Sequence, residues 1–269
     1  SQRQDFTPLP GFEVVSAATG TGSLVAMAGD DAGRLIVSIE SGGLARLADL
    51  DGDGIYETRE ELPCRMRATQ GILWSQGDLF LVGLGSAGLG LYRYAGADLA
   101  AAPRKLVAFQ GDPGEHGPHG VVEGPDGLLY VAVGNHVQVA DVAADSSCRI
   151  AYEGNLLPWI LDPNGHATRV RVPGGIVIAL DRDGRTVRRF AQGFRNHYDL
   201  AFNRHGDLFT YDSDMEWDIG LPWYRAVRVV HVIAGGDYGW RTGSANLPNW
   251  APDTLPPAIE VGRGSPCGM

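Results

Sequence analysis

An arginine–asparagine pair and a later run of acidic residues are the part of this sequence best suited to chemistry. Arg195 and Asn196 end a Gly-Phe-Arg-Asn segment, and acidic side chains follow at alternate positions, namely Asp212, Asp214, Glu216 and Asp218. An arginine can hold a carboxylate through two parallel hydrogen bonds, and an asparagine both donates and accepts. Four carboxylates on one face of a strand repel unless a cation compensates. The pattern favours a site for a polar ligand or a metal, and the alternative is a solvated edge strand.

A second candidate group is the segment Glu-His-Gly-Pro-His-Gly, which contains Glu115, His116 and His119 and precedes an apolar strand. A histidine beside a carboxylate can act as a general base, with its tautomer set by that neighbour. Two histidines three residues apart on a Gly/Pro loop can instead bind a transition metal. The remaining alternative is a polar loop in which both histidines are simply hydrogen-bonded.

Residues 49–60 have the spacing of a calcium-binding loop, with acidic residues at positions 1, 3, 5 and 12 and a glycine at position 6. The candidate ligands are Asp49, Asp51, Asp53, the carbonyl of Ile55, and Glu60. The flanking segments are not those of an EF-hand, because a strand-like segment precedes the loop and Pro63 stops any helix after it. We predict a structural calcium ion here, and the alternative is an Asp/Gly turn that needs no metal.

A turn glycine followed by a short apolar strand recurs along the chain and indicates the fold. The leucines of these strands, Leu35, Leu79, Leu129 and Leu208, are 44, 50 and 79 residues apart. The first two intervals match one four-stranded propeller blade. The third contains an insertion, residues 141–171, within the third blade. With almost no helical periodicity, we predict an all-β propeller, and the alternative is a β-sandwich.

The repeats account for about four blades in a single domain that spans residues 1–269. The chain ends on a turn-like segment with no closing strand, so we expect it to be the N-terminal part of a larger propeller. The alternative is a small propeller that its own N-terminal strand closes.

Composition excludes several classes of protein. The net charge of −10 argues against a nucleic-acid partner. No apolar run is long enough for a transmembrane helix. The three cysteines are far apart, with no Cys-x-x-Cys pair, which argues against a zinc ribbon and a covalently bound haem. The chain starts at a serine that looks like a processed end, and we expect a periplasmic or secreted protein.

Three segments together resemble a known family: Glu115-His116 ten residues before Pro-Asp-Gly, the Gly-Phe-Arg-Asn segment, and Gly235-Gly-Asp-Tyr-Gly-Trp240. The chain resembles the soluble quinoprotein glucose dehydrogenases and their aldose sugar and sorbosone dehydrogenase relatives. It looks most like a membrane-bound dehydrogenase group of planctomycete-type bacteria, whose propeller is often fused to a c-type cytochrome.

The resemblance implies a six-bladed propeller that oxidises a sugar or other alcohol with pyrroloquinoline quinone (PQQ) and calcium. It makes His116 the general base, Glu115 its acidic neighbour, and Arg195 a catalytic residue that stabilises charge on the reduced cofactor. It places Arg195 and Asn196 against the quinone, and we add His119 to this set. The turn Ser213, Asp214 and Met215 corresponds to the one that holds calcium through backbone oxygens. A cytochrome c is the implied electron acceptor.

Two other functions remain open from the residues. The chain can be a non-catalytic propeller that binds a glycan or a protein. It can also be a calcium-dependent hydrolase of the lactonase type, in which Asn135, Asn196 and Asp214 converge on a central ion.

Overall fold

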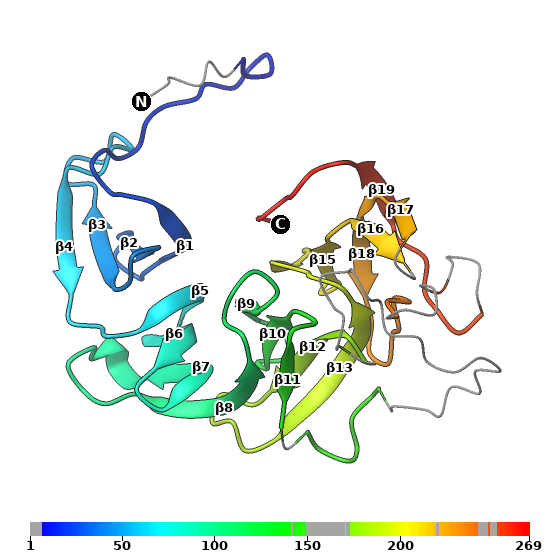
Figure 1. Ribbon diagram of the computed structural model, residues 1–269. Coiled ribbons are helices and arrows are strands. Elements are labelled where there is room, and N and C mark those ends of the chain that lie inside the picture. The colour runs from blue at the N-terminus through cyan, green and yellow to red at the C-terminus, as the bar shows by residue number, and fades with distance from the viewer. Residues whose placement is uncertain are drawn as a thin grey trace.

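The computed structural model describes residues 7–140, 142–148, 170, 173–218, 221–241, 247 and 252–269. Almost all regular structure is antiparallel sheet, and the described helix is one short 3₁₀ turn, η1 (Ala95–Ala97). Four sheets of four or five strands follow one another along the chain and around an arc (Figure 1). The predicted all-β propeller is therefore confirmed. Most of the predicted insertion, residues 141–171, lies outside the described residues.

Each sheet is antiparallel and has its four main strands side by side in chain order, which is the form of a propeller blade. Blade 1 contains β1 (Leu24–Gly29), β2 (Leu35–Ile39), β3 (Leu44–Ala48) and β4 (Thr58–Leu62). Blade 2 contains β5 (Arg67–Ser75), β6 (Asp78–Gly85), β7 (Gly88–Tyr94) and β8 (Arg104–Gly111), and β11 (Val137–Val139) pairs with its outer strand.

Blade 3 contains β9 (Pro118–Glu123), β10 (Leu129–Val133), β12 (Gly175–Leu180) and β13 (Val187–Phe194). Blade 4 contains β14 (Leu200–Phe202), β15 (Leu208–Asp212), β18 (Val227–Val232) and β19 (Ile259–Gly262). A separate hairpin of β16 (Met215–Asp218) and β17 (Leu221–Arg225) lies between β15 and β18. The acidic run is consequently split between β15, which ends at Asp212, the turn that contains Asp214, and β16, so it does not lie on a single strand as we expected.

The recurrent glycines occupy the turn between the first and second strand of each blade. Gly33, Gly77, Gly127 and Gly206 have φ angles of 75°, 78°, 77° and 87°. These left-handed conformations are unfavourable for residues with a Cβ, so the turns require glycine or a similarly tolerant residue. This shared requirement is the physical origin of the sequence repeat.

The hydrophobic core lies between neighbouring blades. Separate buried clusters join blades 1 and 2, blades 2 and 3, and blades 3 and 4. The first strands β1, β5, β9 and β14 contact one another in succession and line the inner side of the arc (Figure 1). None of the described strands of blade 4 is supplied by the N-terminal segment. The expectation that the chain is part of a larger propeller stays a prediction.

Within the described residues, no helix has the length and apolar character that crossing a membrane would require.

Candidate functional site

The candidate residues of blades 3 and 4 lie at the same end of their strands. Neighbouring strands run in opposite directions, so one edge of these two blades collects alternate strand ends. It contains the starts of β9 and β14 and the ends of β10, β13 and β15. The segments at this edge are the link 112–117, the turn 134–136, the link 195–199 and the turn 213–214. The fold therefore brings together segments that are distant in sequence.

His116 is buried and is held on two sides. Its Nδ1 lies 2.7 Å from Oδ1 of Asn135, and its ring stacks on His136 with a centroid separation of 4.4 Å. A Cβ on Gly134 would overlap the backbone of His116, so this close approach needs glycine. Glu115 is exposed, and only its backbone carbonyl is bonded into the cluster, by Nδ2 of Asn196 at 2.9 Å.

His119 is fully buried and contacts residues from two other blades. Its Nε2 lies 2.8 Å from Oδ1 of Asn196, and its Nδ1 lies 3.1 Å from Oε1 of Gln70 on β5. Its ring also stacks on Tyr198 at 4.4 Å. Burial lowers the pKa of His119 to about 4, so the imidazole is neutral at neutral pH and donates from only one of its two ring nitrogens.

The Arg195–Asn196 turn is anchored on Asp212. One oxygen of this carboxylate accepts the backbone amides of Arg195 at 2.9 Å and Asn196 at 3.0 Å. The other oxygen accepts Nη2 of Arg228 at 2.8 Å, and both side chains of this ion pair are buried. The arginine of the turn also donates from Nη1 to Oγ of Ser213 at 3.0 Å. The turn therefore has fixed backbone geometry and a partly exposed guanidinium.

Sequence reasoning missed the structural part that Asp212 plays, because it assigned this residue to an acidic face. In β15, Leu208, Thr210 and Asp212 are buried at alternate positions, but Phe209 and Tyr211 on the other face are aromatic, so the sequence gives no clear signal of this pattern. It also missed Gln70 and Tyr198, whose side chains are joined by a 3.0 Å hydrogen bond from the tyrosine hydroxyl. Nothing in the local sequence around Gln70 distinguishes it.

Two cavities lie on the inner side of the arc beside this cluster. Their volumes are about 250 and 410 Å³, and Val25, Gln70 and Tyr198 line both of them. The larger is also lined by Asp112, Pro113 and Gly114 of the link that leads to Glu115. The hydrogen-bonded cluster around His119 thus adjoins space in which a small polar molecule can lie.

The Gly-Phe-Arg-Asn segment, which we predict to contact the quinone, packs on the Gly-Gly-Asp-Tyr-Gly-Trp segment. The backbone amide of Trp240 donates to the carbonyl of Gly193 at 2.8 Å, and Tyr238 stacks on Phe194 at 4.6 Å. Arg228 donates to the carbonyl of Tyr238 at 2.8 Å. Two of the three segments that carry the family resemblance are therefore packed on each other.

The predicted calcium loop lies at the opposite end of the blades, in the turn between β3 and β4. The structure brings together Asp49, Asp51, Asp53 and Glu57, whose nearest oxygens lie within 4.8 Å of one another. Glu60 is not in this group, because it lies on β4 and pairs with Arg46 at 3.2 Å. Asp49 accepts the backbone amides of Gly52 and Gly54, which lower its pKa.

The second predicted calcium site, at residues 213–215, lies near the Arg195–Asn196 turn. Ser213 accepts the hydrogen bond from Arg195, Asp214 follows it in the turn, and the buried Met215 begins β16. Calcium binding through the backbone oxygens of this turn stays a prediction.

Comparisons with known proteins support the fold. No family model and no curated protein sequence matches the chain. Its structure is similar to that of the PQQ-bound aldose sugar dehydrogenase from Streptomyces coelicolor, with a TM-score of 0.64 and 17% identity over 95% of this chain and 73% of that one. A glucose dehydrogenase-type oxidoreductase from Thermus thermophilus gives a TM-score of 0.61 and 19% identity, over 93% and 73% of the two chains.

The holo PQQ domain of a pyranose dehydrogenase from Coprinopsis cinerea is also similar, with a TM-score of 0.53 and 13% identity, over 81% of this chain and 53% of that one. At these identities the likeness shows a shared β-propeller fold, and the chemistry has to be argued from the residues of this chain.

Proposed function

We propose that this propeller oxidises a sugar or other alcohol with PQQ and calcium as cofactors. The observation that carries the proposal is the grouping of a buried histidine pair, the Arg195–Asn196 turn and the Ser213 turn at one end of two blades. The similarity in fold to PQQ-bound sugar dehydrogenases agrees with it.

The donor set at this edge fits a planar acidic cofactor. The guanidinium of Arg195 is oriented by Ser213, and the side-chain amide of Asn196 is fixed by Glu115 and His119. A guanidinium is the usual partner of a carboxylate in a planar, two-bonded pair. The buried Nδ2 of Asn135 has no hydrogen-bond partner among the described residues, so one polar atom of the cluster still has donor capacity. Arg195 and Asn196 are the residues that would hold the cofactor, and the quinone when bound would accept hydride.

His116 is the proposed general base. An amide oxygen only accepts, so the 2.7 Å contact with Oδ1 of Asn135 requires a proton on Nδ1 of His116. In this tautomer Nε2 is the ring nitrogen that would take a proton from a substrate hydroxyl. Stacking on His136 holds the plane of the ring.

His119 has a different part in this proposal. Both of its nitrogens face side-chain amides, and it lies behind Gln70 and Tyr198 rather than in the cavities. It orients Asn196, and it links the Arg195–Asn196 turn to the inner strand of blade 2. The electron acceptor in the proposal is a cytochrome c, and the setting is periplasmic or secreted.

The test is reconstitution. The purified protein is mixed with PQQ and Ca²⁺, and the quinone absorbance is recorded during titration with a panel of aldoses and alcohols. Saturable binding followed by substrate-dependent reduction supports the proposal. Binding of sugars without reduction would instead favour a glycan-binding propeller, and release of acid from sugar lactones would favour a hydrolase.

A further inference from the structure

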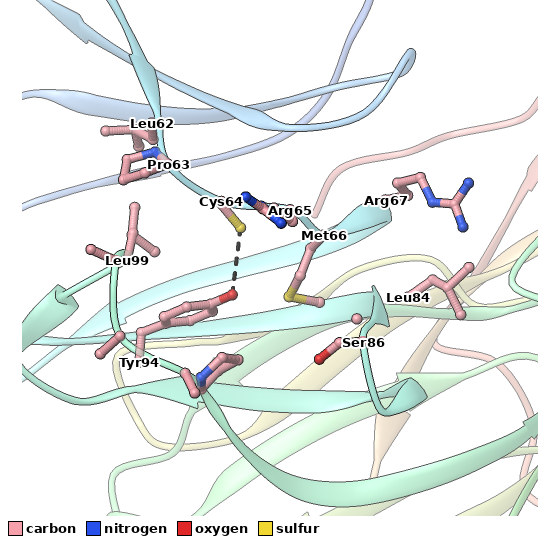
Figure 2. Close-up of a pocket in the computed structure, with 15 residues that line it drawn as sticks. Leu62, Pro63, Cys64, Arg65, Met66, Arg67, Leu84, Ser86, Tyr94 and Leu99 are labelled. Carbon is pink, nitrogen blue, oxygen red and sulfur yellow. Dashed lines mark hydrogen bonds between the residues drawn. The ribbon is translucent and has the colours of Figure 1, made fainter.

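A cavity of about 740 Å³ opens between blades 1 and 2 (Figure 2), and no histidine is among the described residues that line it. Three segments enclose it: the link from β4 to β5 (residues 62–67), the end of β6 with its turn (residues 84–86), and residues 99–103 after η1. This volume is within the range of about 300–1,000 Å³ that small-molecule sites occupy.

The wall of the cavity is mainly apolar. Leu62, Met66 and Leu99 belong to the hydrophobic cluster that joins the two blades. The polar groups of the wall include Sγ of Cys64 and the hydroxyl of Tyr94, which lie 3.6 Å apart and bond to each other (Figure 2). These two groups bond to each other, and the apolar part of the wall offers an occupant van der Waals contact.

The charges at the cavity have one sign. Arg65 and Arg67 line it and are exposed, while no aspartate or glutamate is among its described lining residues. Neither arginine takes part in an ion pair within the described part of the chain, whereas the neighbouring Arg59 pairs with Glu61. Two uncompensated cations beside an apolar cavity are notable in a protein with a net charge of −10.

We propose that this cavity binds a small amphiphilic anion, such as a medium-chain carboxylate. Its hydrocarbon body would lie against Met66, Tyr94 and Leu99, and its carboxylate would face the two arginines. Each methylene buried would strengthen binding about fourfold. Each exposed arginine would add about two- to fivefold. This site is distinct from the proposed oxidation site and does not depend on it.

The direct test compares two ligands of equal chain length and opposite charge by titration calorimetry below their micelle concentrations. Decanoate should bind saturably with one site per chain, and decyltrimethylammonium should bind about tenfold more weakly. Octanoate should bind more weakly than decanoate, by about the factor expected for two methylenes, roughly fifteenfold.

Variants then locate the binding site. Ser86→Trp places an indole at an exposed position of the lining and should abolish decanoate binding, while Ala87→Trp, at the adjacent exposed residue outside the lining, should not. The double variant Arg65→Gln/Arg67→Gln should weaken decanoate about tenfold and should not weaken decyltrimethylammonium binding, because it removes a repulsion from the cation. Arg59→Gln is the matched control for charge.

Each variant is accepted only if its melting temperature stays near that of the wild type, which the exposure of the changed residues makes feasible. Equal affinity for the two ligands, or unchanged decanoate affinity in Ser86→Trp, would overturn the proposal. Neither result would bear on PQQ binding, which is measured separately by quinone absorbance.

Discussion

Arg228 and Asp212 form a buried ion pair in which Nη2 lies 2.8 Å from Oδ2, and Asp212 also contacts the turn that carries Arg195 and Asn196. The other carboxylate oxygen of Asp212 accepts both backbone amides of that turn. Nε and Nη1 of Arg228 have no partner among the described residues, so the guanidinium depends on Asp212 and on the carbonyl of Tyr238. The ion pair therefore positions the candidate anion-binding residues without touching a ligand.

Replacing one member of this pair should be costly. Asp212→Asn leaves the guanidinium of Arg228 uncompensated in the interior, and we expect a loss of about 3–5 kcal/mol in the free energy of unfolding. Urea unfolding measures the change. Asp207→Asn, on a half-exposed aspartate immediately before β15, should change stability by less than about 1 kcal/mol.

The double variant Asp212→Asn/Arg228→Met separates pairing from packing. It removes the uncompensated charge, so it should be more stable than Asp212→Asn alone. A double variant whose loss equals the sum of the two single losses would show that the pair is not energetically coupled.

His116→Ala should abolish turnover of any alcohol that the reconstituted protein oxidises and leave PQQ affinity largely unchanged, because a base acts on the substrate. The control variant is His205→Ala. His205 is exposed and lies on the turn between β14 and β15, at the opposite end of the blades. Turnover is followed by dye reduction and PQQ binding by absorbance. Wild-type turnover in His116→Ala would remove the assignment of this residue as the base.

Stability should fall on acidification because two buried histidines stay neutral in the folded protein. Burial lowers the pKa of His119 and of His197 to about 4, from an ordinary value of 6.5. Between pH 6.5 and 4 the unfolded chain binds protons that the folded chain does not. Each histidine then contributes a loss of about 1.4 kcal/mol per pH unit over this window.

Burial raises the pKa of Asp199, so just above the ordinary carboxyl pKa the folded chain binds a proton that the unfolded chain does not. In that range Asp199 makes the protein more stable as the pH falls, which opposes the effect of the histidines. Urea midpoints measured from about pH 7.5 to about 4.5 should therefore decline most clearly between about pH 6 and 5. His119→Gln should reduce this slope, and His205→Ala should not. A midpoint that does not change across the window would contradict the neutral state of these histidines.

Two measurements can distinguish a calcium-binding turn between β3 and β4 from a turn that binds no metal. If the turn binds calcium, Ca²⁺ should raise the melting temperature and EDTA should reverse the effect. Glu57→Gln should weaken the response, since Glu57 lies with the three aspartates, while Glu60→Gln should not. A melting temperature that neither Ca²⁺ nor EDTA changes would identify the turn as metal-free.

The class of fold follows from local features of the sequence. The turn glycines between the first two strands of each blade must adopt positive φ, and the following strands must be apolar because blades pack face to face. Both requirements are local, so they are visible as a repeat. In β15 the residues that face inward are Leu208, Thr210 and Asp212, while the aromatic Phe209 and Tyr211 occupy the other face, so the sequence of this strand does not show that Asp212 is buried.

The set of residues that meet at the site depends on how the blades pack together. His119 meets Gln70 and Asn196 only because three blades converge on the inner side of the arc, and these contacts span 49 and 77 residues of sequence. In the acidic turn, the residue at position 12 of the calcium-loop pattern enters β4 and pairs across the sheet with Arg46, so Glu57 takes its place beside the aspartates. Sheet register places each side chain on one face or the other, and a linear motif does not contain that register.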